Sequence, residues 1–145
     1  MFHKLLVPVD GSPSATAALL QAIEVAKAFK ASIAVIAVYD AHPFVVSAAE
    51  YGYTHAQFSE VVKAEASTNA QRAKDIVSET GLKAEILVRE SAKTWRGILE
   101  AADNSHSDMI VMGSHGRSGL DRLVMGSVTQ SVLQRTTLPV LVVQN

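Results

Sequence analysis

The fold of this chain is decided by the stretch Leu5-Leu6-Val7-Pro8-Val9-Asp10-Gly11-Ser12-Pro13. Its first five residues are an unbroken apolar run, which predicts a strand covered on both faces, and the next four predict a turn. Ser12 or Ser14 can cap a helix that follows, with Pro13 tolerated in its first turn. A second apolar run at residues 33–39 completes a strand, a helix and a strand within forty residues, which favours a parallel crossover.

The same alternation continues along the rest of the chain. The first helix carries its apolar stripe up to Phe29, and residues 40–59, where the periodicity lapses, are predicted to form a loop. The later elements are a helix over 62–77 that stops near Gly81, a strand over 84–89, a helix capped by Thr94, a strand over 108–112, a helix over 127–135 and a strand over 139–143. Five strands alternating with four helices favour one α/β domain, residues 1–145, built as a doubly wound, open parallel sheet.

Composition and charge exclude several classes of protein. The chain has 145 residues with 13 basic and 14 acidic side chains, and a net charge of -1 gives no broad positive field for nucleic acid. Cysteine is absent, which excludes disulfides and thiolate metal sites and fits a reducing compartment. No apolar stretch approaches the roughly 18 residues that span a bilayer, and the N-terminus lacks a signal-peptide core. We therefore expect a cytoplasmic protein that is not embedded in a membrane.

Glycines concentrate in residues 113–129 more than anywhere else in the chain. Glycine permits positive φ angles and close backbone approach, so several N–H groups can converge on one phosphate. Gly126 and Ser127 then open a helix whose unpaired amides favour an anion, and the hydroxyls of Ser127 and Thr129 can add donors. In a doubly wound sheet this loop and the loop after the first strand flank the point where ligands bind. We therefore expect a nucleotide here, above all ATP.

Phosphate contacts alone are marginal for useful affinity. Three or four hydrogen bonds to a charged group are worth about 5–10 kcal/mol before ordering costs, and micromolar binding needs about 8 kcal/mol. A contact to ribose or base is therefore expected as well. Asp10 is placed to accept from ribose hydroxyls or to hold Mg²⁺, and Arg117 or Arg122 can reach a phosphate. No second histidine stands at metal-ligand spacing from His115, so we expect no metal role for it.

Each of these features also has a purely structural interpretation. The residues around Asp10 can be only a turn and a helix cap, and Gly113 and Gly116 can serve only the close packing of strand against helix. Three functions stay open: a regulatory protein that binds ATP, a slow ATPase or self-phosphorylating enzyme that uses Ser127, and an interaction module without nucleotide. The chain lacks the G-x-x-x-x-G-K-[ST], G-x-G-x-x-G and G-x-S-x-G motifs, which favours binding over turnover.

The glycine spacing also resembles a known family. Gly113, Gly116, Gly126 and Ser127 match, position for position, the G-x2-G-x9-G-[ST] pattern of the ATP-binding members of the universal stress protein family. The similarity extends to the ranges 6–12, 108–123 and 139–143. The resemblance implies an adenine-nucleotide alpha-hydrolase-like fold with strand order 3-2-1-4-5 and ATP held between the loops after strands one and four.

The resemblance assigns roles to particular residues. It implies that the nucleotide contacts Pro8, Val9, Asp10, Val38, Met112, Gly113, His115, Gly116, Gly126, Ser127, Val128 and Thr129, with Val38 using its backbone. It also implies a homodimer, or a higher oligomer, through the last strand at Val140, Leu141, Val142 and Val143. A regulated partner protein such as a transporter and a role in the stress response are implied as well. The segment Glu90-Ser91-Ala92-Lys93-Thr94 departs from many relatives, which have a glycine and a proline there.

Overall fold

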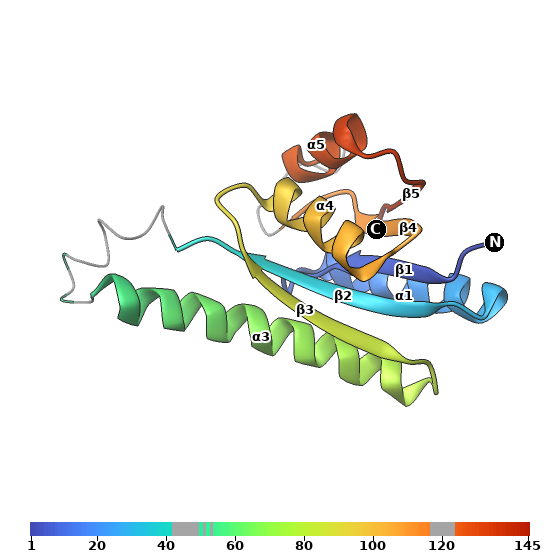
Figure 1. Cartoon of the computed structure of the whole chain (residues 1–145), viewed down its shortest axis with the longest axis horizontal. Helices are drawn as coiled ribbons and strands as arrows, with labels where there is room; N and C mark the ends of the chain where they lie inside the picture. Colours follow the sequence, from blue (N-terminus) through green and yellow to red (C-terminus); the bar gives the residue numbers. More distant parts are fainter. Residues whose placement is uncertain (42–49, 51, 53, 117–123) are drawn as a thin grey trace.

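The structure, a computed structural model, describes residues 1–41, 50, 52, 54–116 and 124–145 (Figure 1). Strands and helices alternate along the chain. In order, they are β1 (Lys4–Pro8), α1 (Pro13–Phe29), β2 (Ser32–Tyr39), α3 (His55–Glu79), β3 (Ala84–Glu90), α4 (Thr94–Ser105), β4 (Met109–Gly113), α5 (Ser127–Arg135) and β5 (Val140–Val143). None of the helices in these described ranges combines the length and the apolar character that a membrane span requires.

The five strands of the described residues form one sheet in the order β3-β2-β1-β4-β5, and every neighbouring pair is parallel. The predicted fold class and strand order are therefore confirmed. β1 lies at the centre, between β2 and β4. The chain builds outward from β1 to β3 and then returns to the other side of β1. The carboxyl ends of β1 and β4 consequently flank the point where the strand order reverses.

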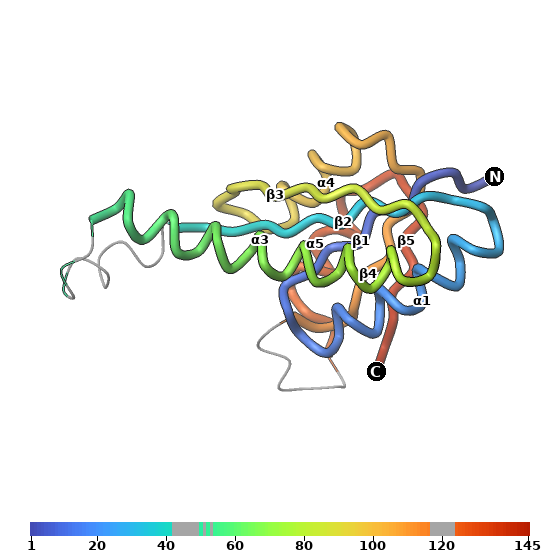
Figure 2. The backbone as a smooth tube through the Cα atoms, turned by 90° about the horizontal axis from the view of Figure 1, so that it is seen from below, coloured from blue at the N-terminus to red at the C-terminus, as the bar shows by residue number. Residues whose placement is uncertain are grey.

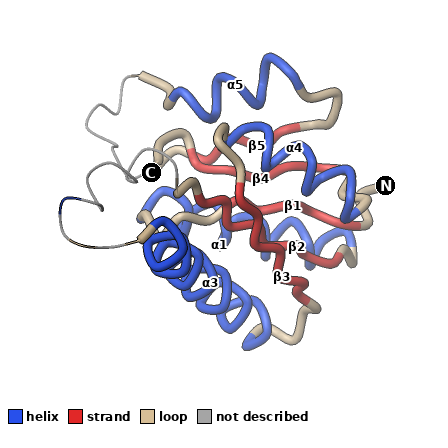
Figure 3. The backbone as a smooth tube through the Cα atoms, turned by 60° about the vertical axis from the view of Figure 1, so that its left-hand side comes forward, coloured by secondary structure: helices blue, strands red, loops and turns tan. Residues whose placement is uncertain are grey.

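Helices cover both faces of this sheet (Figure 3). α1 and α3 pack on the face where Leu5 and Val7 of β1 are fully buried, and α4 and α5 pack on the face where Leu6 is fully buried. Successive residues of a strand point to opposite faces, so one unbroken apolar run supplies both cores. Burying each of these side chains is worth about 1.5–3 kcal/mol, which is why β1 tolerates no polar residue at its centre.

α1 begins where the sequence predicts. Ser12 has an extended backbone, and its Oγ accepts a hydrogen bond from the backbone N–H of Ala15 at 3.2 Å. Of the two predicted caps, Ser12 is therefore the right one, because Ser14 lies inside the helix. Phe29 is less buried than its place in the apolar stripe suggests, since 40% of it is exposed at the last position of α1. Its ring instead packs edge-on against the ring of Phe2, with centroids 5.3 Å apart.

α3 starts earlier than predicted. The loop expected over 40–59 is wrong for residues 55–59, which are the first turn of α3, whereas residues 42–49, 51 and 53 lie outside the described part of the chain. The start is set by a capping box: Thr54 Oγ1 accepts from the Gln57 N–H at 3.1 Å, and Gln57 Oε1 accepts from the Thr54 N–H at 2.8 Å. Gly81, with φ 82°, follows the other end as predicted. Figure 2 shows the N-terminal half of α3 extending beyond the sheet.

The cap predicted for α4 is also wrong. Thr94 is the first residue of this helix, and the capping position is held by Lys93, which has an extended backbone and makes no side-chain capping bond. Ser91 sets the turn instead, because its Oγ donates to the Lys93 carbonyl at 2.8 Å. Ile98 and Ala102 of α4 are buried against the sheet.

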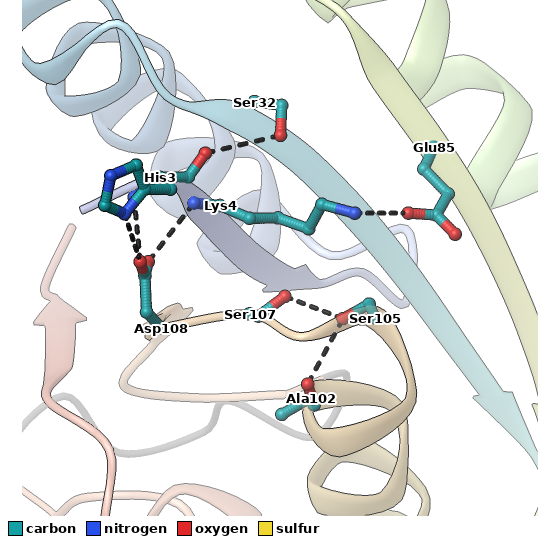
Figure 4. A network of polar contacts seen from close by, with 8 residues as sticks. All are labelled: His3, Lys4, Ser32, Glu85, Ala102, Ser105, Ser107 and Asp108. Carbon is teal, nitrogen blue, oxygen red and sulfur yellow. Dashed lines mark hydrogen bonds and ion pairs between the residues drawn. The ribbon is translucent and has the colours of Figure 1, made fainter.

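A polar network joins the amino ends of the strands (Figure 4). Asp108 accepts hydrogen bonds from the backbone N–H groups of His3 at 2.8 Å and Lys4 at 3.2 Å, and its Oδ2 lies 3.3 Å from His3 Nδ1. Burial acts to raise the pKa of Asp108, but these hydrogen bonds outweigh it and hold the pKa below its usual value. Lys4 also pairs with Glu85 of β3 at 3.1 Å. The network therefore ties β1 to the start of β4 and, across β2, to β3.

Candidate functional site

A cavity of about 790 Å³ opens at the carboxyl ends of β1, β2 and β4. This is the switch point of the sheet, and the volume falls within the range of roughly 300–1,000 Å³ that small-molecule sites occupy. The cavity is lined by all twelve residues that the family resemblance assigns to a nucleotide: Pro8, Val9, Asp10, Val38, Met112, Gly113, His115, Gly116, Gly126, Ser127, Val128 and Thr129. Residues from distant parts of the sequence are thus gathered around one space.

Asp10 follows β1 and lies opposite the glycine loop. Its Oδ1 accepts from the backbone N–H of Ser12 at 2.9 Å, which closes the turn between β1 and α1. Its Oδ2 lies 3.4 Å from the point where a Cβ on Gly116 would stand. The structural and functional interpretations of Asp10 therefore hold together, because one oxygen stabilises the turn and the other faces the loop after β4.

The two glycines that follow β4 have different roles. A Cβ on Gly113 would overlap Ser14 Oγ and would lie 2.9 Å from the backbone C and O atoms of Ser14, so this glycine allows α1 to pack closely on β4. Ser14 Oγ also accepts from the His115 N–H at 3.4 Å. Gly116 instead borders the open cavity, where Asp10 is the nearest neighbour of an added Cβ. The packing interpretation thus fits Gly113, and the ligand interpretation fits Gly116.

Positive φ angles, which the sequence predicted for this loop, are not found at its described glycines, Gly113, Gly116 and Gly126. The described glycines with positive φ are Gly11, Gly52 and Gly81. Close backbone approach is the reason at Gly126, where an added Cβ would lie 3.1 Å from the Ser114 carbonyl oxygen. The Gly126 N–H donates to that same oxygen at 2.7 Å, which closes the loop between β4 and α5.

The amino end of α5 opens on the cavity. Gly126 occupies the capping position and has no side chain with which to cap the helix. The first hydrogen bond along the helix runs from the Gln130 N–H to the Gly126 carbonyl at 3.0 Å. The N–H groups of Ser127, Val128 and Thr129 therefore have no partner within the helix, and the positive end of the helix dipole lies beside them.

The two hydroxyls near this helix start are not equivalent. Thr129 is buried, and its Oγ1 donates to the carbonyl oxygen of Gly113 at 2.9 Å. This hydrogen bond connects α5 to the end of β4 and uses the hydroxyl proton of Thr129. Thr129 can therefore donate to a ligand from its backbone N–H, but not from its side chain as predicted. Ser127 lines the cavity with its hydroxyl in the first turn of α5.

α3 forms one wall of the cavity, and none of its residues is among the predicted site residues. The residues of this wall are Phe58, Val61, Val62, Glu65, Ala66 and Asn69. They recur at intervals of three and four, so one face of α3 borders the cavity. A signal for this wall exists in the sequence, because Asn69 interrupts an otherwise apolar stripe of the helix. A polar residue in such a stripe is not explained by packing.

Val38 and Tyr39, at the end of β2, line the side of the cavity opposite α5. The side chain of Val38 also packs with the core on the α4 face, where a Cβ on Gly97 would come within 2.9 Å of both its methyl groups. The side chain of Val38 is therefore partly buried in that core. Thr94, in the segment that departs from the family pattern, lines the cavity as well.

The expected charged groups of the loop fall partly outside the described residues. Arg117 and Arg122 belong to the range 117–123, of whose placement nothing is described. In the part of the chain that the structure describes, no three His, Cys, Asp or Glu side chains gather as a metal site. A cation held by Asp10 would therefore take its remaining ligands from a phosphate chain and water.

Comparison with known proteins identifies relatives over the whole length of the chain. The sequence pattern of the universal stress protein family matches residues 1–144. The chain is 35% identical to the universal stress protein MJ0531 of Methanocaldococcus jannaschii, over 99% of this chain and 83% of the relative. It is 31% identical to the universal stress protein YxiE of Bacillus subtilis, over 99% and 100%.

Solved structures share the fold. The structure of hypothetical protein MJ0577 superposes with a TM-score of 0.82 at 28% identity, over 100% of this chain and 97% of that one. A universal stress protein in complex with cAMP gives 0.69 at 22% identity, over 99% and 97%. A universal stress protein from Archaeoglobus fulgidus in complex with dAMP gives 0.71 at 20% identity, over 98% and 97%. At the identities of these two complexes, the likeness shows the fold alone.

Proposed function

This chain belongs to the universal stress protein family, and we propose that it is a regulatory member that binds ATP in the cavity between β1, β4 and α5. One observation carries the proposal: the uncapped start of α5, the loop after β4 and the carboxylate of Asp10 all border the same cavity. The related complexes with cAMP and dAMP support an adenine nucleotide as the ligand, because both ligands carry adenine.

The phosphates fit the α5 end of the cavity. The backbone N–H groups of Ser127, Val128 and Thr129 lie unpaired within the helix at the amino end of α5, where the helix dipole favours an anion. Each hydrogen bond from these groups to a phosphate oxygen is worth about 1.5–3 kcal/mol. Gly116 has no side chain, which leaves room in the cavity for the phosphate chain. If Mg²⁺ accompanies ATP, Asp10 can supply one carboxylate oxygen while phosphates and water supply the rest.

The base fits the other end, between β2 and α3. Val38 lies there on the β2 side, and Phe58, Val61 and Val62 lie on the α3 side, so apolar side chains form part of both walls. An adenine ring is flat and largely apolar on its two faces, and burying it between such walls adds to the affinity that phosphate contacts supply. The cavity therefore offers both of the contacts that micromolar binding requires.

We propose binding rather than rapid turnover as the activity. Phosphoryl transfer depends on positive charge placed at the transferred group. Among the described residues that line the cavity, none is a lysine or an arginine. In the proposed mechanism the nucleotide state alters assembly or the contact with a partner protein. α5 leads directly into β5, so a ligand at the start of α5 can influence the edge of the sheet.

We also propose that the protein forms a homodimer through β5. This strand pairs with β4 on one side, with the carbonyls of Pro139 and Val143 accepting from β4 and its continuation at 3.0 Å. Because successive backbone groups alternate in direction, the N–H and carbonyl groups of Val140 and Val142 point to the open edge. An apolar edge strand with unpaired backbone groups is a ready site for pairing with a second copy.

The test is calorimetric titration of Mg-ATP into the protein and into a graded pair of variants. Gly116→Ala adds one carbon at 3.4 Å from Asp10 Oδ2, an ordinary contact, whereas Gly116→Val places two more carbons in the gap where phosphate is expected. We expect a small loss of affinity for the first and a loss of more than tenfold for the second.

The control is Gln134→Val on α5, which changes an exposed residue that does not line the cavity. Unchanged affinity in Gly116→Val, or equal losses in Gly116→Val and the control, would contradict the site. No measurable ATP binding by the parent protein, together with no nucleotide found by mass analysis after gentle purification, would overturn the function.

A further inference from the structure

Asn69 occupies an unusual position on α3. The inner face of this helix is formed by Ala66, Ala70 and Ala73, all buried, and along the same side Val62 and Ile76 lie seven residues before and after Asn69. Asn69 is partly buried and lines the cavity. An amide in an apolar row loses water without gaining hydrophobic stabilisation, and asparagine is also a poorer helix former than alanine. Packing and helix propensity therefore do not account for this residue.

Asn69 reaches the turn after β1. A Cβ on Gly11 would lie 2.9 Å from Asn69 Oδ1 and 3.2 Å from Nδ2, so the amide lies beside this glycine, where a side chain at position 11 would crowd it. Gly11 has φ 82°, a conformation that itself favours glycine. The glycine thus does two things at once: it allows the turn that presents Asp10, and it lets the Asn69 amide approach that turn.

The amide has hydrogen-bonding capacity to spare at this place. A primary amide carries two N–H donors and one carbonyl acceptor. Among the described residues, no protein group forms a hydrogen bond with the Asn69 side chain, although its amide lies beside Gly11. An amide whose purpose was to fix α3 to the turn would be expected to use that backbone. The geometry instead leaves its polar atoms for a group inside the cavity.

The order of the strands indicates that the sugar of a bound nucleotide would lie beside Asn69. The phosphate end of the cavity is at β4 and α5, the apolar end is at β2 and α3, and β1 with Asp10 stands between them. The middle part of a nucleotide is its sugar. Asp10 directly precedes Gly11 and the Asn69 amide lies beside Gly11, so both residues line this middle region.

We propose that Asn69 is a specificity-determining residue that hydrogen-bonds a ribose hydroxyl of the bound nucleotide, and so distinguishes ribonucleotides from deoxynucleotides. The inference rests on the proposed function, because it assumes a nucleotide in this cavity. Asp10 accepts only, as a carboxylate, whereas the Asn69 amide can both donate and accept. The pair can therefore satisfy both the oxygen and the proton of a sugar hydroxyl, which a deoxy sugar lacks.

The experiment compares the binding of ATP, 2′-deoxy-ATP and 3′-deoxy-ATP to the parent protein, to Asn69→Ala and to a control, by calorimetric titration. The control is Gln71→Ala, on the exposed face of the same helix, where Gln71 donates to Asp75 at 2.8 Å. We expect the parent to prefer ATP over one deoxy analogue by about three- to tenfold, the range of one neutral hydrogen bond. In Asn69→Ala this preference falls toward onefold, because ATP and the analogue that keeps the contacted hydroxyl bind more weakly, whereas the analogue that lacks it binds as it does to the parent.

Two results would overturn the proposal. If the ratio of the affinities for ATP and for each deoxy analogue is the same in the parent and in Asn69→Ala, whether or not all three nucleotides bind more weakly, the amide does not contact a ribose hydroxyl. If the parent binds none of the three, the proposed function fails and this inference fails with it. Thermal unfolding of Asn69→Ala, expected to be unchanged or slightly improved, shows that the helix is intact.

Discussion

Replacing Gly113 by alanine tests whether the glycines after β4 have separate roles. The new Cβ would overlap Ser14 Oγ and would come within 2.9 Å of the Ser14 backbone C and O atoms. Overpacking a close contact costs about 1–3 kcal/mol, and the upper end applies because backbone atoms of a buried helix turn cannot swing aside as a side chain can. We expect Gly113→Ala to lower the free energy of unfolding by about 3 kcal/mol.

Thermal and urea unfolding of the nucleotide-free protein measure this loss. For a chain of this size, 1 kcal/mol corresponds to about 2–4 °C in Tm, so we expect a decrease of roughly 6–12 °C. Gly116→Ala is the matched comparison, because its Cβ would lie 3.4 Å from Asp10 Oδ2, in ordinary contact. Its Tm is expected to stay within about 2 °C of the parent or to rise slightly, since alanine restricts the unfolded chain.

A second substitution locates the strain. Ser14→Ala in the Gly113→Ala background removes the overlapping hydroxyl but leaves the Ser14 backbone in place. We expect it to restore part of the lost stability, so that the double variant is more stable than the sum of the single changes predicts. The reasoning is refuted if Gly113→Ala melts within 2 °C of the parent, or if Gly116→Ala loses as much stability as Gly113→Ala.

Three further outcomes are expected. Thr129→Val leaves the buried Gly113 carbonyl without its hydroxyl donor and should lower the free energy of unfolding, measured in urea titrations, by about 1–3 kcal/mol. The control is the same change at the exposed Thr137, which should cost under about 0.5 kcal/mol, and equal effects of the two changes would contradict the role of this hydrogen bond. The pKa of Asp108 is lower in the folded protein, so its contribution to stability is present above the unfolded pKa of about 3.9 and is lost as pH falls through the folded value. The free energy of unfolding of Asp108→Asn should therefore fall less steeply than that of the parent below about pH 5. Parallel curves for the two proteins would contradict this prediction. Val142→Pro removes a backbone N–H from the open edge of β5 and should give monomers in analytical ultracentrifugation, and a dimer that survives this change would rule out pairing through β5.

The fold was predictable from local sequence because each element carries its own signal. The apolar run of β1 requires cover on both faces, and Ser12 marks the start of α1. Alternating elements of that kind leave few topologies, since parallel crossovers are almost always right-handed. The error at Thr94 is of one residue, and α3 begins seven residues before the predicted start, at His55 instead of residue 62. At α3 the capping box of Thr54 and Gln57 was present in the sequence, and the aromatic residues around it obscured the helical pattern.

The candidate site was predictable only in part. The glycine spacing and its family resemblance pointed to twelve residues, and the structure brings these to one cavity. Which of those residues faces the cavity and which one packs could not be known, since Gly113 and Gly116 look alike in a sequence. The difference is that Ser14 of another element stands against the first of them.

The sequence by itself determined the order of the strands and helices and most of their positions, because periodicity and capping are properties of neighbouring residues. It also determined that a glycine loop precedes the uncapped start of α5. Only the tertiary structure decided that Asp10 lies opposite Gly116, that α3 closes one side of the cavity and that Asn69 touches the turn at Gly11. Such contacts join residues far apart in the chain, and they depend on how whole helices pack against the sheet, which no local pattern encodes.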